Sequence, residues 1–554
     1  MAREFAISIY DSMSKGLAPE YSTNRALGYL EKAKNIRVTK TGGIEPYIPT
    51  ILPFEQALLD SHGIEYNWPY PYMLKGKKYT WLCLDTDIFI VNEEDWSLLH
   101  LDDIEDYNGV VQNEKIIRGT RWQLVDFWDT WFLHNGKCTI FETGLNSLLG
   151  NDSKIHVNSH IGINAGCAHR GRRWLGGFDS DNFYTENRAP GYMKASANPR
   201  SKYNWKNFWD DLIDSAQGAP ADMGVGLKFS ELKSNWAMWS TIGGGDLLYL
   251  FNYDLMRKGV TGVDYAANTV HDDNYIFQIL QQNTWGMAPM SWQGDILSVS
   301  PLGKAVIYAG TGGVTALIPV GDKVGVKEFP KLSQGIFTSG CVGGDEEQLL
   351  IMDSSGMLWL INEELQVQRV GYENILGSMA GTDVVITYDN NDRNFYICNH
   401  EQSYILTSQG LTSHTQRVTC IVNTSGGALS LGVIEQLDES MEILTEPFDM
   451  GTAGLKTIVQ VEVIRSIEEW AITQGTPHID ISILFRNSSR DYWKETEKRK
   501  LNNNDNVRIP ITAKEFKLRI TSDNFADTKI ENVIIKYQAS DKRFTRGINM
   551  QEVQ

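Results

Sequence analysis

A cysteine–histidine pair and a histidine pair come nearest in this sequence to a reactive site. Cys167 and His169, in the stretch GINAGCAHRGRRW, could supply a nucleophile and a general base. No nucleophile-elbow sequence flanks them, and a core cysteine beside a surface histidine gives the same pattern. His156 and His160 are spaced for a metal on a helix, but IHVNSHIGIN favours a strand, so they would not share a helical face.

Other motifs with chemical potential are incomplete. Asp85 and Asp87 resemble the start of a calcium loop, but the following residues, IFIV, form a strand pattern without ligand oxygens. The glycines at 243–245 lack the lysine and helix of a phosphate-binding loop. The six cysteines include no C-x-x-C pair. We therefore expect no enzymatic activity, no metal site and no cofactor.

Acidic residues are concentrated in one stretch of a chain that carries a net charge of −18. This balance argues against general wrapping of nucleic acid, which needs a basic face. Residues 85–106 contain nine carboxylates and no Lys or Arg, and could form a strongly negative wall. The nine are Asp85, Asp87, Glu93, Glu94, Asp95, Asp102, Asp103, Glu105 and Asp106.

Basic residues are concentrated near the C-terminus. Residues 486–546 hold fifteen Lys or Arg against nine Asp or Glu, a balance of +6, so the remaining chain carries −24. We predict a docking segment here, with ordinary solvated surface as the alternative for both charged stretches. The candidate docking residues are Lys498, Arg499, Lys500, Lys517, Arg519, Lys542, Arg543 and Arg546.

A recurring pattern of short apolar runs predicts a mainly β protein with a repeat. Similar units begin at Ala305, Leu349 and Asn394, so their starts are 44 and 45 residues apart. Each is preceded by another apolar run, at 296–300, at 335–341 and at 383–388. Four strands in about 45 residues is the period of a β-propeller blade. We predict six or seven blades over residues 76–430.

Other segments depart from this period. A helical face in NWKNFWDDLIDSAQG predicts a helical insertion at about 186–234. Residues 1–75 carry spaced prolines and are expected to form an extended arm, in cis or onto a neighbouring subunit. Alternating strand patterns over 440–545 predict an antiparallel β-sandwich, and 546–554 a C-terminal tail.

A carbohydrate-active propeller is the enzymatic alternative. Sialidase blades carry an S-x-D-x-G-x-T-W turn, and DSSGMLW at 353–359 is similar but has altered spacing and no Thr. Catalytic carboxylates of glycosidases cannot be located from one sequence. A generic cytoplasmic scaffold propeller is a second alternative.

The C-terminal strand pattern resembles a known family. LKTIVQVEV at 455–463 and EFKLRITSDNFADTKIENVIIKYQ at 515–538 are similar to the sandwich of tail nozzle proteins of short-tailed bacteriophages, also called head-completion, packaged-DNA-stabilisation or tubular tail proteins. TGGIEPYIPTILPF at 41–54 is similar in kind to an N-terminal strap in that family. Long-tailed phages also use propeller-like tail-tip and stopper proteins, so the resemblance does not decide which tail component this chain forms.

The resemblance implies a structural virion protein, made in the bacterial host cytoplasm and located in the tail. It implies a homo-oligomeric ring, of six copies, that retains packaged DNA and forms the channel for its ejection. The expected partners are an adjacent portal or adaptor ring, distal tail or fibre proteins, and double-stranded DNA that passes without specific binding. No run approaches the length of a membrane helix, so we expect no membrane insertion.

Overall fold

The structure is a computed structural model. It describes residues 4–9, 13–20, 28–49, 68–84, 87–94, 97–101, 116, 118–127, 130–143, 154–158, 162–178, 234–239, 286–320, 326–424, 427–433, 440–467, 478–522 and 528–540. The predicted helical insertion at 186–234, apart from its last residue, and the tail at 546–554 lie outside this set. The chain divides into two compact units. One contains residues 1–69, 370–379 and 386–554, and the other contains residues 70–369 and 380–385.

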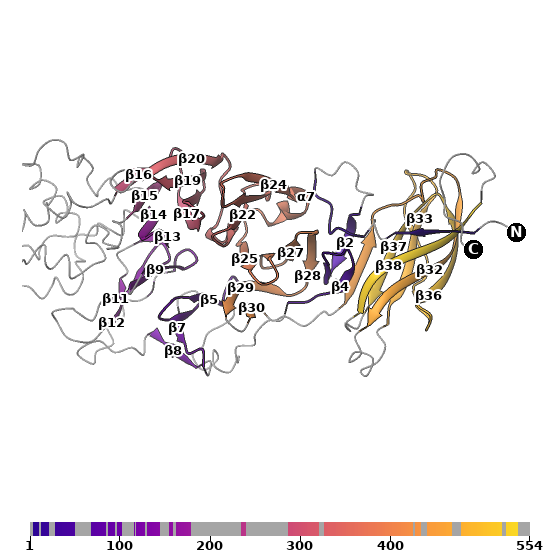
Figure 1. The fold of residues 1–554 in the computed structure, drawn as a ribbon, viewed down its shortest axis with the longest axis horizontal. Coiled ribbons are helices and arrows are strands. Elements are labelled where there is room, and N and C mark those ends of the chain that lie inside the picture. Colours follow the sequence, from indigo (N-terminus) through magenta and orange to yellow (C-terminus); the bar gives the residue numbers. More distant parts are fainter. Residues whose placement is uncertain are drawn as a thin grey trace, which may run out of the picture. The chain divides into compact units, whose positions relative to one another are not determined.

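The fold is mainly β, as predicted, and the second unit is built from four-stranded antiparallel sheets that follow one another along the chain (Figure 1). In each, a strand pairs with its sequence neighbour. The five sheets are β5–β8 (Tyr72–Lys75, Thr80–Cys83, Ile88–Val91, Leu98–His100), β9–β12 (Gln123–Phe127, Thr130–His134, Thr139–Thr143, Lys154–Asn158), β13–β16 (Ile163–His169, Arg172–Phe178, Trp236–Trp239, Gly286–Pro289), β17–β20 (Ile296–Leu302, Ala305–Gly310, Gly313–Pro319, Val326–Leu332) and β21–β24 (Val342–Gly344, Gln348–Met352, Leu358–Asn362, Val367–Gly371).

The predicted repeat is present at the level of strands. The runs predicted to begin at Ala305 and Asn394 start there as β18 and β26, and the run predicted from Leu349 is β22, which starts one residue earlier. One preceding run differs: the segment predicted as a strand at 335–341 ends in a 3₁₀ turn, η6 (Ser339–Cys341), and β21 follows it. The amide N–H of Ile336 donates to the Gly310 carbonyl, so this segment bonds to the preceding sheet before its own ladder begins.

In the sheets β5–β8 and β17–β20, burial decreases from the second strand to the fourth. The second strands β6 and β18 are wholly buried. The fourth strands β8 and β20 contain no buried residue. The sheets therefore have an inner part, made by the early strands, and an outer strand that faces solvent.

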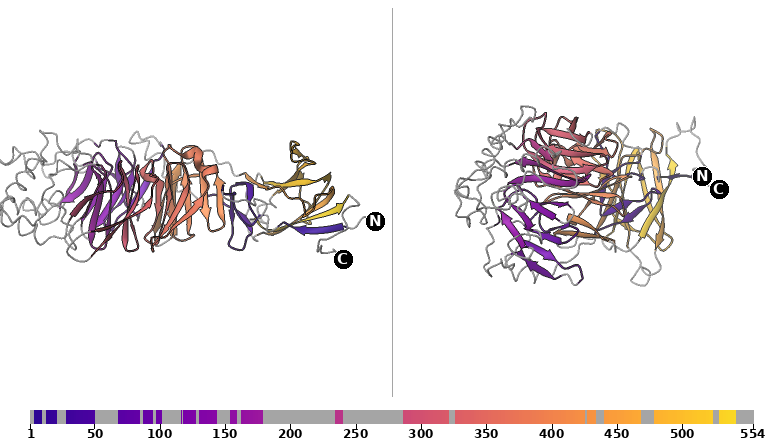
Figure 2. Two further views of the ribbon diagram at one scale, coloured as in Figure 1. Left: turned by 90° about the horizontal axis from the view of Figure 1, so that it is seen from above. Right: turned by 60° about the vertical axis from the view of Figure 1, so that its left-hand side comes forward.

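First strands of different sheets contact one another within this unit. The Gln123 side chain of β9 donates to the Leu297 carbonyl of β17 at 3.1 Å. The Asn164 side chain of β13 donates to the Ile296 carbonyl of β17 at 2.8 Å. Three consecutive sheets thus converge on their first strands, and Figure 2 shows the purple sheets of residues 123–178 beside the pink sheet β17–β20.

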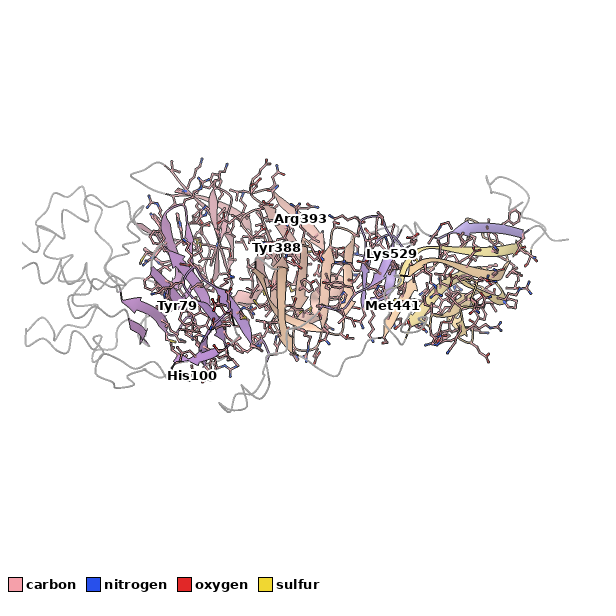
Figure 3. All side chains as sticks on the ribbon, turned by 60° about the horizontal axis from the view of Figure 1, so that its bottom comes forward. Tyr79, His100, Tyr388, Arg393, Met441 and Lys529 are labelled. Carbon is pink, nitrogen blue, oxygen red and sulfur yellow. The ribbon has the colours of Figure 1, made fainter. Side chains whose placement is uncertain are left out.

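Aromatic side chains fill the space between neighbouring sheets. The rings of Trp81 and Trp131, from β6 and β10, have centroids 4.5 Å apart. Tyr79, labelled in Figure 3, packs edge-on against Trp131 at 5.8 Å. These large rings account for much of the abundance of aromatic residues in the sequence, because each buries a wide apolar surface.

Asn and Asp side chains hold the turn between second and third strands. Asn135 Oδ1 accepts from the amides of Lys137 and Cys138, at 3.0 and 2.8 Å. Asp353 and Asn399 occupy the equivalent turns of the sheets β21–β24 and β25–β28 and accept main-chain N–H groups in the same way. Such side chains replace a backbone carbonyl in a tight turn, so the repeat is maintained by chemistry of turns as well as by strand period.

The other unit contains the remaining sheets, and N-terminal strands complete them. The strands β25–β28 (Val385–Asp389, Asn394–Cys398, Ser403–Thr407, Gly410–His414) continue through β2 (Leu30–Lys34) into β31 (Met441–Thr445), β37 (Glu515–Ser522) and β33 (Asp480–Arg486). A further sheet has the order β3 (Ile36–Val38), β4 (Ile44–Pro46), β38 (Thr528–Ala539), β32 (Lys456–Ile467), β36 (Asn506–Ala513), with β1 (Glu4–Ser8) also on β38. A separate hairpin joins β29 (Arg417–Thr424) and β30 (Gly427–Val433). The only helices described outside η6 are α7 (Glu373–Leu376) and η7 (Gly377–Met379).

Asn35 joins the N-terminal strands to the rest of this unit. It is fully buried and has a left-handed backbone with φ of 52° between β2 and β3. Its amide group donates to the Ser440 carbonyl at 2.9 Å, and its Oδ1 accepts from the Thr415 amide at 2.9 Å. One side chain therefore connects three stretches of chain, and asparagine is the non-glycine residue that best tolerates this φ.

We expect Asn35→Ala to lower the free energy of unfolding by about 3 kcal/mol, because buried partners lose their hydrogen bonds and Ala is strained at this φ. Asn35→Gly keeps the backbone conformation and removes only the side chain, so its loss should be about 1 kcal/mol smaller. Urea unfolding of both variants measures the two contributions. Equal stability of Asn35→Ala and wild type would show that the junction contributes nothing.

Two buried histidines, one in each unit, should make stability fall in acid. Burial and the nearby Arg173 cation lower the pKa of His134 to about 3, and burial lowers that of His414 to about 3. An unfolded histidine titrates near 6.5. Because the unfolded chain then binds the extra protons, stability is fully present above pH 6.5 and is lost as the pH falls toward 3.

At pH 5 we expect each histidine to cost about 2 kcal/mol relative to pH 7. The double variant His134→Gln, His414→Gln should have a flatter dependence of the urea midpoint on pH between 7 and 5. A wild-type midpoint that stays constant over this range would contradict the prediction.

Candidate docking and channel surfaces

The described part of the predicted acidic wall is partly neutralised by local partners. Glu93 forms an ion pair with Lys75 at 2.9 Å and accepts a hydrogen bond from the Thr80 hydroxyl. The hydrogen bond from Thr80, and then that from Lys75, lower the pKa of Glu93. Asp87 lies 3.3 Å from His100, which Figure 3 labels in the sheet β5–β8.

Glu94 is exposed, and its amide bonds to Asn92 Oδ1 at 3.1 Å within the turn that precedes β8. The three described members therefore lie at the ends of β7 and in this turn. The other predicted members lie outside the described residues: Asp85, Asp95, Asp102, Asp103, Glu105 and Asp106.

Two of the predicted docking residues are engaged within the chain. Lys517 is almost buried, pairs with Glu31 and lies over the Trp493 ring at 4.5 Å. Arg519 pairs with Glu495 at 2.5 Å and with Glu442 at 3.2 Å. These cations stabilise β37 against β2, β31 and β34 (Lys494–Glu495).

Lys498, Arg499 and Lys500 are instead exposed at the surface. Arg499 and Lys500 form β35, which, like β34, pairs with β33 through only two residues. Lys542, Arg543 and Arg546 lie outside the described residues.

Three exposed cations that the sequence prediction omitted extend this surface. Arg490 and Lys494 flank Tyr492, whose side chain is 94% exposed. Arg508 on β36 is exposed, and its carbonyl accepts from the Arg499 guanidinium at 2.7 Å, which brings β35 and β36 together. We call the six exposed residues the basic edge: Arg490, Lys494, Lys498, Arg499, Lys500 and Arg508. The alternation of β36, with buried Val507 and Ile509 on either side, is the sequence feature that indicates that Arg508 points outward.

Nearby carboxylates do not neutralise the basic edge, since most are bound to other cations. Glu515 pairs with Arg486 at 2.5 Å, and Asp505 pairs with Arg465 at 2.7 Å. Glu495 is bound to Arg519 as described above. Of the acidic residues described at 487–500, the exposed Asp491 and Glu497 form no ion pair, so the edge keeps a positive balance of charge.

Cys167 and His169 do not have the character of a nucleophile and its base. Cys167 is buried in a hydrophobic cluster with Trp174 and Tyr308, and burial raises the pKa of its thiol. Burial lowers the pKa of His169. A thiol kept neutral by apolar surroundings is a poor nucleophile, so this pair belongs to the core. His156 lies on β12, and His160 lies outside the described residues.

Asp353, in the stretch similar to a sialidase turn, is a structural residue. It is fully buried, and Oδ1 accepts from the amides of Ser355 and Met357 and from the Ser355 hydroxyl, at 2.9, 3.1 and 2.7 Å. Its Oδ2 accepts from the Trp359 indole at 2.8 Å. Four donors occupy this carboxylate, so it serves to fix the turn and not to transfer protons.

Among the described residues, neither a metal-binding cluster nor a membrane-spanning helix is found. These residues contain no group of three or more His, Cys, Asp or Glu side chains arranged to hold a metal ion. Within the same residues, no helix is both long enough and apolar enough to cross a bilayer.

Comparisons with known proteins give structural neighbours only. No protein-family model and no curated protein matches the sequence. One similar solved structure is the extracellular domain of what is described as a one component system, BT4673, from B. thetaiotaomicron, with 8% identity and a TM-score of 0.38 over 87% of this chain and 59% of that chain. A second, of the extracellular domain described as that of a hybrid two component system, has 8% identity and a TM-score of 0.36 over 86% of this chain and 58% of that chain. The chain thus spans about three fifths of the length of each.

We expect Asp353→Ala to lower the free energy of unfolding by about 3 kcal/mol, since it leaves four donors, none of them on a fully exposed residue, without their acceptor. Glu347→Ala is the matched control, because it removes an exposed carboxylate from the same sheet. The control should change stability by less than about 0.5 kcal/mol. Thermal or urea unfolding compares the two variants, and an equal loss of stability in both would contradict the structural role of Asp353.

Proposed function

We propose that this chain is a structural virion protein that forms a ring in the tail nozzle or head-to-tail connector of a short-tailed bacteriophage. In this proposal the four-stranded sheets are blades of a β-propeller, and the two C-terminal sheets form a β-sandwich. The ring retains packaged DNA and provides the channel for its ejection.

The convergence of first strands is the observation that carries the proposal. Gln123 of β9 reaches across to Leu297 of β17, although the sheet β13–β16 lies between them in the sequence. Blades arranged around an axis bring their innermost strands together in this way and leave fourth strands outside. The exposed β8 and β20 agree with that arrangement. In this proposal DNA passes between copies and not through one propeller.

The C-terminal sheets support a role as an assembly platform. β1 pairs with β38 over five residues, and β2 lies between β28 and β31. The two ends of the chain thereby form one body, with side chains such as Ile458, Ile481 and Phe516 fully buried. A body of two sheets presents exposed edges that neighbouring subunits can contact.

The charge balance is compatible with a DNA channel. A duplex slides most easily past walls that do not bind phosphate, because each Lys or Arg contact adds affinity through counterion release. The net charge of −18 and the exposed Glu94 in the acidic run fit such a wall. The partners in this proposal are other copies of the chain, a portal or adaptor ring above it and distal tail or fibre proteins, with no membrane inserted.

Quantitative mass spectrometry of purified DNA-containing particles tests the proposal. We expect about six copies per particle, judged against the major capsid protein, as closed cyclic symmetry would give. Absence of the chain from particles would contradict the proposal and would direct attention to glycan binding and hydrolysis.

A further inference from the structure

We propose that the basic edge of one copy binds an acidic turn cluster on the sheet β21–β24 of the next copy, so that this contact joins subunits head to tail. The inference rests on the proposed ring and names the surfaces that would hold it together. The basic edge consists of six exposed cations, and the exposed acids among them are Asp491, Glu497 and Glu495, of which Glu495 is paired with Arg519.

The acidic turn cluster lies where the β21–β22 and β23–β24 turns contact the β17–β18 turn. The Gly303 amide donates to the Glu346 carbonyl at 2.8 Å, so the β21–β22 turn abuts the β17–β18 turn. Gly303 has φ of 54°, and a Cβ there would lie 2.6 Å from the Glu363 carbonyl oxygen. The β21–β22 and β23–β24 turns are therefore held side by side against Gly303.

Carboxylates dominate the cluster. Four glutamates are exposed, and Asp345 accepts the amides of Glu347 and Gln348 to fix its turn. Lys304 is exposed in the adjoining turn, and Lys331 donates to the Leu365 carbonyl, so the cluster stays negative. Its five acidic residues are Asp345, Glu346, Glu347, Glu363 and Glu364.

A second copy fits the basic edge better than duplex DNA does. Outside residues 486–546 the chain carries −24, and six copies at −18 each would carry −108. Closing such a ring requires a contact of opposite sign. DNA carries one charge per about 1.7 Å of its axis and extends past any local patch, so it would also meet the negative remainder of the chain. A compact acidic cluster on a second copy would contact the basic edge without meeting that negative surface.

The contact is heterologous, because each copy offers its basic edge to one neighbour and its acidic turn cluster to the other. Heterologous contacts generate rings when the rotation closes. The exposed Tyr492 within the edge adds an aromatic side chain of the kind enriched in interfaces. Opposite charges across the interface also set the register of the two subunits.

A charge-swap experiment on the full chain tests the inference. Sedimentation velocity should show self-association of the wild type at about 0.1 M salt that is lost at about 1 M, where the Debye length falls to about 3 Å. The basic-edge variant K498E/R499E/K500E and the acidic-cluster variant E347K/E363K/E364K should each weaken association at least about tenfold. Combining all six substitutions should restore it.

A matched control separates local docking from total charge. K40E/K137E/K327E changes the net charge by the same amount as the basic-edge variant, at exposed lysines outside both surfaces, and should still associate. The acidic-cluster variant makes the chain less negative, so simple repulsion predicts tighter association where docking predicts loss. Circular dichroism verifies that each variant is folded.

Three outcomes would overturn the inference: a monomeric wild type at low salt, failure of the combined variant to associate, or equal loss in the control. Loss of binding to a short DNA duplex by the basic-edge variant, with self-association unchanged, would assign the edge to nucleic acid instead. If the charge swap fails while particles contain about six copies, the ring proposal stands and only this contact is wrong.

Discussion

The unit that contains both chain ends depends on β2 having partners on each side. β2 lies between β28 and β31, and at its end Asn35 bonds to Thr415, 380 residues later, and to Ser440, 405 residues later. Lys517 adds an ion pair to Glu31 on the same strand. Without β2, the sheet β25–β28 and the strands β31, β37 and β33 would share no ladder. Lys517, predicted to dock a partner, thus secures this strand instead, and the exposed cations are those of the basic edge.

In the proposed ring, opposite requirements act on the charge of this protein. A wall along which DNA slides must not bind phosphate, whereas subunits of a ring must attract one another. The two kinds of charge lie in different parts of the sequence. Carboxylates predominate over most of the chain, and cations are concentrated near the C-terminal strands. In the described acidic run, Lys75 offsets the charge of Glu93, so repulsion within one copy is reduced while Glu94 stays exposed.

The repeating strands could be predicted because their apolar runs have a regular period. The units beginning at Ala305, Leu349 and Asn394 were visible for this reason. Pairing over long sequence separation left no such pattern: nothing local to Leu30–Lys34 indicates β28 and β31 as its partners. Likewise, Lys517 and Lys498 look alike in a sequence, and only tertiary structure shows that one is almost buried against Trp493 while the other is exposed.

The position of β2 has a consequence for synthesis on the ribosome. The strand leaves the exit tunnel early, but its partners in β28 and β31 are translated about 380 to 410 residues later. The consecutive four-stranded sheets can pair as they emerge, since each uses neighbouring strands. During this period β2 lacks both partner strands and is an exposed edge that can bind other nascent chains. This topology therefore requires that β2 be protected until its partner strands are made. A chaperone could cover it, or neighbouring copies could be translated at different times.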